Sequence, residues 1–176
     1  MRNRSPSKAY GKDGTIIMRY AGIIYDDTAA APGLSLSLYT QGCPFHCKGC
    51  HNPETWCFNG GYEYTAETQE KIIKSLNANG VLRNLCILGG EPLLKENILV
   101  LSLLCGLAKT LYPDIKIYIW TGYTMEEIIE RETDEPALYK LLEFVDTLIT
   151  GRYEEDKRDI TLPLRGSWNQ EVWQMQ

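Results

Sequence analysis

The chain lacks any long hydrophobic run. Its longest apolar stretch, Ile98 to Ala108, is interrupted by Ser102 and Gly106. It is also shorter than the roughly 20 residues that a membrane-spanning helix requires. The sequence therefore excludes a transmembrane segment here, and we expect this stretch to lie in a buried helix of a folded domain.

Positive charge is also scarce. The 176 residues include 18 Lys and Arg against 23 Asp and Glu, which gives a formal net charge of -5 and a pI of about 5.1. No overall positive field is available to neutralise phosphates or to hold an anionic membrane surface. We therefore expect neither nucleic acid nor a membrane among the partners of this protein.

The chain shows no secretory signal, because no apolar segment follows the basic residues near its start. We therefore expect a cytoplasmic protein. The first residues are rich in Ser, Gly and Lys, and residues 1–17 are predicted to form a flexible N-terminal extension. Residues 18–176 have the length of a single domain, with little left over for a second core.

Six cysteines are present, and in a cytoplasmic protein they do not indicate a disulfide framework because the cytosol keeps thiols reduced. Three of them, Cys43, Cys47 and Cys50, lie within eight residues, in a segment whose prolines and glycines exclude regular structure. This crowding indicates a metal site. Three thiols rather than four leave a coordination position open, which chemistry at a metal requires.

The cysteine spacing alone leaves three kinds of site open. A structural zinc site would be completed by His51 or Cys57. A ferredoxin-like cluster would take Cys57 as its fourth ligand. A cluster held by three cysteines would instead keep one iron free to bind a substrate.

Apolar and polar residues alternate from Leu34 to Thr40, which predicts a half-buried strand directly before the cysteine loop. Three further strands alternate with four helices. The predicted strands are Leu85–Leu88, Ile115–Trp120 and Phe144–Thr150, and the predicted helices are Thr65–Gly80, Asn97–Lys109, Thr124–Glu130 and Pro136–Glu143. Beyond Gly151 the chain is polar and predicted to be irregular, with exposed Trp168 and Trp173.

Strands that alternate with helices predict parallel βαβ units with right-handed crossovers. A complete eight-stranded barrel needs about 250 residues, so this length allows part of such a barrel or an open doubly wound sheet. We expect an α/β fold built as an incomplete, partial TIM-type barrel. Ligands of such folds bind at the carboxyl ends of the strands. Four segments leave those ends, so we expect one face to collect them: the cysteine loop, Gly89-Gly90-Glu91-Pro92, Thr121-Gly122-Tyr123 and Thr150-Gly151-Arg152.

Two local patterns support this reading of the chain. Thr124 and Glu127 have the spacing of a capping box at the start of a helix. Asp146 lies inside an apolar strand, where an unpaired carboxylate would be costly, so we expect it to have a partner.

The cysteine spacing C-x-x-x-C-x-x-C, followed by Gly-Gly-Glu-Pro after the next strand, resembles the radical S-adenosylmethionine superfamily. Within it, the sequence is similar to the activating proteins of anaerobic ribonucleoside-triphosphate reductases over about residues 20–173. The similar runs are Thr40–Cys43, Cys50–Trp56, Trp120–Tyr123, Val145–Asp146, Gly151–Tyr153, Leu164–Ser167 and Asn169–Gln170. In that family an arginine commonly stands where this chain has Ser35, so any anion contact made by the arginine is not carried over.

The resemblance implies an iron-sulfur enzyme. Cys43, Cys47 and Cys50 would hold a 4Fe-4S cluster and act as the catalytic residues, and the open iron would bind S-adenosyl-L-methionine. The residues implied in binding this cofactor are Gly49, Cys50, His51, Gly89, Gly90, Glu91 and Thr121. The enzyme would cleave it reductively to a 5'-deoxyadenosyl radical.

The resemblance also implies partners: an anaerobic ribonucleoside-triphosphate reductase that receives a glycyl radical, and a low-potential electron donor such as flavodoxin. Two alternatives stay open. One is an activase of another glycyl radical enzyme, such as a formate-lyase type, and the other is a zinc-stabilised interaction module.

Overall fold

The computed structural model describes residues 18–132 and 134–175, so the extension predicted for residues 1–17 lies outside the described part of the chain. Seven strands form one sheet. They are β1 (Arg19–Asp27), β2 (Ser35–Thr40), β3 (Tyr62–Glu63), β4 (Asn84–Gly89), β5 (Ile117–Trp120), β6 (Thr147–Thr150) and β7 (Glu171–Gln174), and their order across the sheet is β3-β1-β2-β4-β5-β6-β7.

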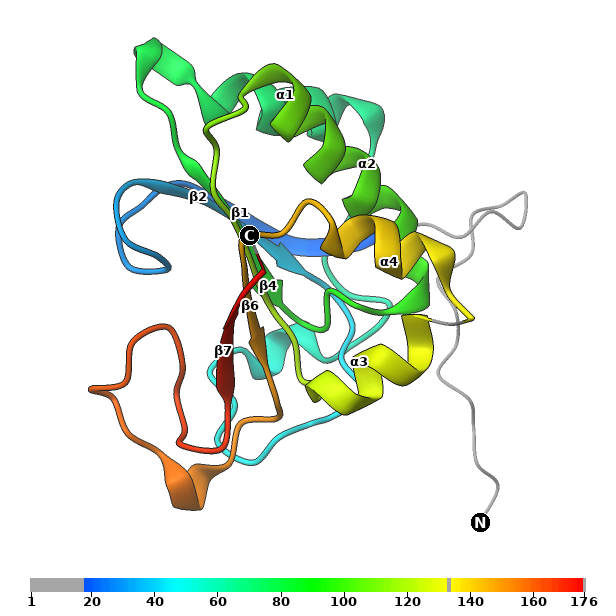
Figure 1. Ribbon diagram of the computed structural model, residues 1–176, viewed down its shortest axis with the longest axis vertical. Coiled ribbons are helices and arrows are strands. Elements are labelled where there is room, and N and C mark those ends of the chain that lie inside the picture. Colours follow the sequence, from blue (N-terminus) through cyan, green and yellow to red (C-terminus); the bar gives the residue numbers. More distant parts are fainter. Residues whose placement is uncertain (1–17, 133, 176) are drawn as a thin grey trace.

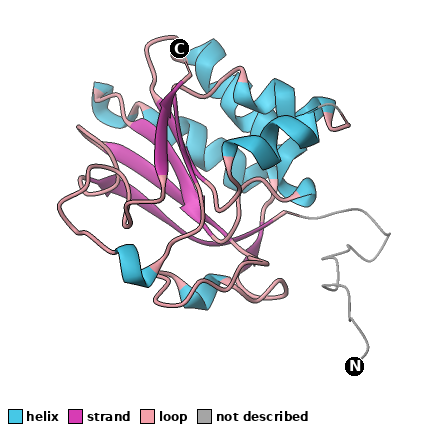
Figure 2. Ribbon diagram, turned by 60° about the horizontal axis from the view of Figure 1, so that its bottom comes forward, coloured by secondary structure: helices cyan, strands magenta, loops and turns pink. Residues whose placement is uncertain are grey.

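Four α-helices are described: α1 (Ala66–Leu76), α2 (Lys95–Leu111), α3 (Met125–Glu132) and α4 (Pro136–Leu142). All four lie on one face of the sheet (Figure 1). Short 3₁₀ turns follow at Pro53–Thr55, Ala78–Gly80 and Glu155–Lys157. Figure 2 shows the same two layers, with the helices on one side and the long loops on the other. None of the helices in the described residues is long and apolar enough to cross a membrane.

The centre of the sheet is parallel. Strands β2, β4, β5 and β6 are neighbours and run in the same direction, while β1, β3 and β7 pair antiparallel on the two sides. Each crossover leads to the next strand on the same side. Because such crossovers are right-handed, they place every helix on the same face. The protein thus has a mixed α/β fold, and the sheet of the described residues is open, with β3 and β7 at its edges.

The two faces of the sheet differ in their neighbours. Leu85, Ile87, Ile117 and Ile119 are fully buried in the hydrophobic core beneath the helices. The residues between them point to the opposite face, where Ser37, Cys86, Tyr118 and Thr147 stand in register across β2, β4, β5 and β6. The long loops that follow the carboxyl ends of the strands lie on this side of the sheet (Figure 2).

The four predicted strands are all confirmed, with small differences at their ends. The predicted helices are confirmed as well. The Thr65 hydroxyl accepts a hydrogen bond from the Thr68 backbone N–H, as expected of an N-cap. The capping box is formed, because the Thr124 backbone N–H donates to Glu127 and the Glu127 N–H donates to the Thr124 hydroxyl.

Two expectations about burial and regularity were wrong. The tail is not irregular throughout, because Glu171–Gln174 forms β7 against β6, and the Trp173 indole donates to the Thr150 hydroxyl. The stretch from Ile98 to Ala108 was expected to lie in a buried helix, but α2, which contains it, is only partly buried. One face of α2 packs in the core, whereas Leu99, Leu103 and Leu111 on its other face are exposed.

Candidate active site

A cavity of about 780 Å³ lies at the carboxyl ends of the parallel strands. Its walls come from four loops: the cysteine loop after β2, the glycine loop after β4, and the segments after β5 and β6. The residues before β2, from Ala29 to Pro32, close another side. The expectation that one face collects the unusual segments is therefore confirmed.

The cysteine loop is fixed at both ends by backbone hydrogen bonds. Gly42 donates to the Thr55 carbonyl at 2.7 Å, and Cys43 donates to the Trp56 carbonyl at 3.2 Å. Within the loop, the Cys50 N–H donates to the Cys47 carbonyl at 3.1 Å. The loop is thus folded back on its own continuation, which brings residues 43 to 50 around the cavity.

The six cysteines fall into two groups. Cys43, Cys47 and Cys50 all line the cavity, the first buried and the other two half-buried. The remaining cysteines do not line it. Cys57 is exposed, Cys86 is buried on the face of the sheet opposite the helices, and Cys105 is buried in the core beneath the helices.

Burial raises the pKa of two thiols that line the cavity, those of Cys43 and Cys47. It raises the pKa of Cys43 to about 11, although the backbone N–H groups of Phe45 and His46 oppose the rise. It also raises the pKa of Cys47, against the effect of the Tyr153 backbone N–H. Cys50 accepts a hydrogen bond from the Asn52 backbone N–H at 3.4 Å. The sulfur atoms of Cys43 and Cys47 therefore already face N–H donors that favour their thiolate forms.

The donor set of this cavity suits an iron-sulfur cluster. Three thiols converge from one loop, and each iron of a cluster takes its own thiolate. Among the described residues, no three His, Cys, Asp or Glu side chains are arranged closely enough to hold one metal ion. The zinc site considered above would need all its ligands about 2.0–2.3 Å from one ion.

The glycine loop packs directly against the cysteine loop. The Gly90 N–H donates to the Thr40 carbonyl, and the Glu91 N–H donates to the Gly42 carbonyl at 2.8 Å. A side chain at Gly90 would collide with the backbone of Gly42. Gly89 has a φ of 101°, a left-handed conformation that glycine adopts without strain. The absence of side chains at Gly89 and Gly90 thus allows the two loops to pack together. Both glycines also line the cavity.

Glu91 is fully buried, and its carboxylate accepts three hydrogen bonds. The donors are the Leu93 N–H at 2.8 Å, the Thr121 hydroxyl at 2.7 Å and the Gly122 N–H at 2.7 Å. Burial raises the pKa of Glu91 to about 7, while these donors oppose the rise. Glu91 therefore ties the loop after β4 to the loop after β5, and Thr121 is its partner in that tie.

The remaining predicted residues lie at the edge of the site. His51 lines the cavity but is exposed, with its ring 5.7 Å from that of Tyr153. Gly49 does not line the cavity. Its φ is 75°, and a side chain there would meet Glu155 and Tyr153. All the predicted residues except Gly49 are therefore brought together in one cavity.

Comparison with known proteins gives the same picture. Residues 29–173 match the family described as "4Fe-4S single cluster domain". The chain is 35% identical over 147 residues to the anaerobic ribonucleoside-triphosphate reductase-activating protein of Vibrio cholerae, covering 83% of this chain and 91% of that protein. The proteins of the same name from Salmonella typhimurium and Pasteurella multocida are 32% and 31% identical, covering 88% and 89% of this chain and 97% of each relative. The chain belongs to this family of activating proteins.

The family match and the cavity coincide in the chain. The matched range contains Cys43, Cys47 and Cys50 together with every other residue that lines the cavity. The part of the chain that matches the 4Fe-4S family therefore also supplies the three thiols of the cavity. These findings support an enzyme role.

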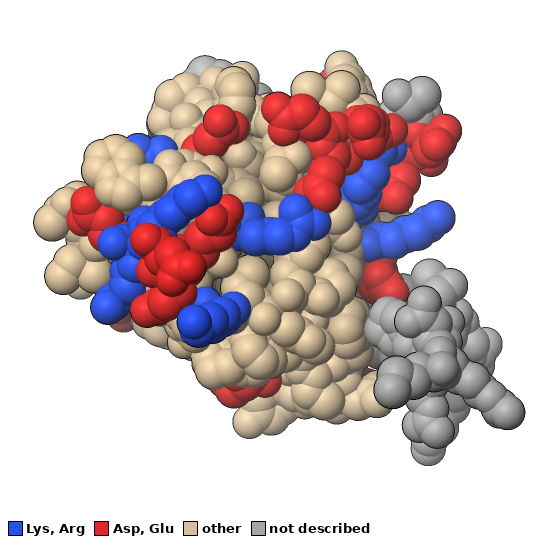
Figure 3. Space-filling view, turned by 90° about the horizontal axis from the view of Figure 1, so that it is seen from below, with Lys and Arg blue, Asp and Glu red and all other residues tan. Residues whose placement is uncertain are grey.

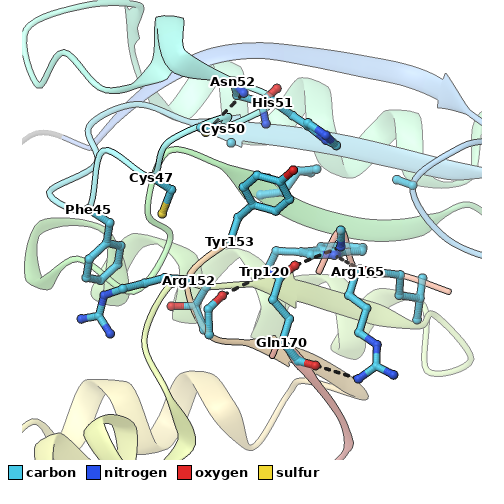
Figure 4. A pocket seen from close by; sticks show the side chains of 18 of the residues that line it. Phe45, Cys47, Cys50, His51, Asn52, Trp120, Arg152, Tyr153, Arg165 and Gln170 are labelled. Atoms are coloured by element: carbon cyan, nitrogen blue, oxygen red, sulfur yellow. Dashed lines mark hydrogen bonds between the residues drawn. The ribbon is translucent and has the colours of Figure 1, made fainter. Parts of the chain in front are cut away.

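Several residues of the cavity wall were not predicted as site residues. Phe45 and Arg152 lie side by side next to Cys47, and Trp120, Arg165 and Gln170 form the opposite wall (Figure 4). Thr-Gly-Arg at the exit of β6 was the available signal for Arg152. Arg165 and Gln170 could not be found from spacing, because the tail folds back across the strand ends through long-range contacts.

A segment of the tail, residues 158–166, forms this wall. The Trp120 indole donates to the Leu164 carbonyl at 2.6 Å, and the Gln170 side chain accepts from the Gly166 N–H and donates to the Gly151 carbonyl. Figure 3 looks onto this end of the molecule and shows its charged side chains in two groups with uncharged surface between them. Lys and Arg are mixed with Asp and Glu in one group, and Asp and Glu prevail in the other.

Proposed function

We propose that this protein holds a 4Fe-4S cluster on Cys43, Cys47 and Cys50, binds S-adenosyl-L-methionine beside it, and activates an anaerobic ribonucleoside-triphosphate reductase. The observation that carries the proposal is the meeting of three thiols and the Gly89-Gly90 loop in one cavity of a chain from this family. The three cysteines would hold the cluster, which once bound and reduced would supply the electron that splits S-adenosylmethionine into methionine and a 5'-deoxyadenosyl radical, and this radical would take a hydrogen atom from a glycine of the reductase.

The residues of the chain would bind the cluster and S-adenosylmethionine and hold them in position. The three thiols would lose their protons on binding iron, and the backbone N–H groups that face Cys43 and Cys47 favour the charged form. The backbone of Gly89 and Gly90, free of side chains, offers carbonyl groups to the methionine ammonium. Glu91 and Thr121 would act mainly by holding that loop in place, because the Glu91 oxygens already accept three hydrogen bonds.

The edge of the cavity would receive the rest of the cofactor. Gly49, Cys50 and His51 would lie near the adenosyl group, and the segment of residues 158–166 would limit the access of water. We further propose a single domain over residues 18–176, related to a partial TIM-type barrel. Its helices cover one face of the sheet and its site lies at the strand ends, as in barrels of this type.

The partner assignment rests on the relatives, which are named for the reductase rather than for a formate-lyase-type enzyme. A low-potential donor such as flavodoxin would supply the electron. A cytoplasmic location would suit three free thiols that must stay reduced.

The first test of this function is reductive cleavage. The protein is reconstituted with iron and sulfide without oxygen, reduced in the presence of S-adenosylmethionine, and assayed for 5'-deoxyadenosine. We expect formation of 5'-deoxyadenosine that depends on both iron and reductant. A colourless protein that takes up zinc in stoichiometric amount, and forms no 5'-deoxyadenosine, would instead support the interaction module.

A further inference from the structure

Arg152 reaches from the end of β6 to the cysteine loop. Its guanidinium stacks over the ring of Phe45, with the guanidinium carbon 4.3 Å from the ring centroid. Phe45 stands between Cys43 and Cys47 in the sequence, and Figure 4 shows Arg152 beside it, below Cys47. Cation and ring are therefore in the geometry of an attractive contact next to a proposed cluster ligand.

Phe45 is held from the other side as well. Its ring meets the ring of Tyr123 edge-on, with centroids 5.0 Å apart, and a side chain at Gly122 would collide with it. The loop around Cys47 is thus clamped between Arg152 and the segment after β5. A clamp of this kind fixes the distance between the Arg152 charge and Cys47.

Glu127 of α3 balances the charge of Arg152. The two terminal guanidinium nitrogens of Arg152 donate to the Glu127 carboxylate, at 2.8 Å and 3.1 Å, which orients the guanidinium plane. Arg152 lines the cavity, whereas Glu127 does not. The positive member of the pair is therefore the one that faces the proposed cluster.

The charge of Arg152 acts on the proposed cluster through this arrangement. A positive charge attracts added negative charge, and the attraction weakens as the separation grows. Reduction of a cluster adds one electron, so charges close to a ligand help to set its potential.

We propose that Arg152 is a positioning residue that raises the midpoint potential of the cluster by holding its charge beside Cys47, and that Glu127 limits this effect. The inference rests on the proposed ligation by Cys43, Cys47 and Cys50. It assigns to Arg152 and Glu127 a role in how easily the cluster is reduced.

The test is a redox titration of the reconstituted protein, followed by electron paramagnetic resonance. Arg152→Gln should shift the midpoint potential to a more negative value, and Glu127→Gln should shift it to a more positive value. Gln at position 127 keeps the capping-box pattern, so α3 should be retained. Arg152→Lys keeps the charge and should stay closer to wild type than Arg152→Gln. Both shifts should shrink at high salt, because the pair is partly exposed.

The matched control is Lys140→Gln, which removes one positive charge from an ion pair on α4 that does not line the cavity. It should leave the potential unchanged. Equal potentials for wild type, Arg152→Gln and Glu127→Gln would overturn the inference. If Arg152→Gln binds no iron, the sign of the Glu127→Gln shift decides, and a negative or absent shift overturns it. A wild-type protein that binds no cluster would instead refute the ligation.

Discussion

The three cysteines of the cavity differ from the other three in their surroundings. Cys43, Cys47 and Cys50 lie in one loop with backbone N–H groups directed at their sulfur atoms. Cys57 follows only a few residues later but is exposed and does not line the cavity. These surroundings separate the proposed ligands from a nearby thiol more sharply than the spacing does.

We expect that replacing any of Cys43, Cys47 or Cys50 by Ala abolishes iron binding in anaerobic reconstitution, because no other thiol lines the cavity in the described residues. Iron and sulfide analysis with the absorbance near 400 nm measures this. Cys57→Ala is the control and should bind as much iron as wild type. Full iron retention in Cys47→Ala would contradict the ligand assignment.

Gly90 permits a close contact between backbones. We expect Gly90→Ala to push the glycine loop away from Gly42, to reduce the iron bound, and to lower the free energy of unfolding by about 2 kcal/mol, as overpacking does. Denaturant unfolding and iron analysis measure both effects.

Gly22→Ala provides the matched control, because nothing lies within 4 Å of a Cβ built at that position in β1. It should change the stability by no more than about 0.5 kcal/mol. If the two variants are equally stable and bind equal iron, the contact between the loops is not needed.

At the scale of elements, Asp146 joins three segments of the fold. Its carboxylate accepts from Lys109 of α2 at 2.7 Å, from Lys116 at 2.9 Å and from the backbone N–H of Ile117 in β5. The expected partner of this buried carboxylate is therefore confirmed as a structural one. Burial acts to raise the pKa of Asp146, but these donors together hold it below its ordinary value of 3.8.

We expect Asp146→Asn to lower the free energy of unfolding by about 3 kcal/mol at neutral pH, because it leaves Lys109 without its charged partner. A carboxyl group with a depressed pKa stabilises the folded state above its unfolded pKa, and this contribution is lost as the pH falls through the folded pKa. The difference between wild type and Asp146→Asn should therefore be full above about pH 4 and shrink below it. Denaturant unfolding at several pH values measures it, and a difference that does not depend on pH would contradict the ionic role.

The elements that were predicted from sequence are those with strong local signals. The strand β2 alternates apolar and polar residues, and α3 begins with a capping box. The strands that were missed have no such signal. In β1, Gly22 and the run Ile23-Ile24 break the alternation, β3 has only two residues, and β7 lies in a polar tail. Their formation depends on pairing with distant strands, which a local pattern does not contain.

The whole molecule explains why part of the site could be predicted and part could not. The cysteines and Gly89-Gly90 leave the ends of parallel strands, so the α/β topology alone brings them together. Residues 158–166 reach the cavity only because the tail folds back and β7 pairs with β6. The Arg152–Phe45 clamp likewise joins residues more than 100 positions apart, a contact that no spacing within the sequence indicates.

The central claim concerns what the whole molecule does to its partner, and one measurement tests it most directly. Reduced, reconstituted protein is mixed with S-adenosylmethionine and the cognate anaerobic ribonucleoside-triphosphate reductase without oxygen, and the mixture is examined by electron paramagnetic resonance. We expect the doublet of a glycine α-carbon radical on the reductase, absent when Cys47→Ala replaces the wild-type protein. Formation of 5'-deoxyadenosine with the reductase present but without any such doublet would contradict the assigned partner.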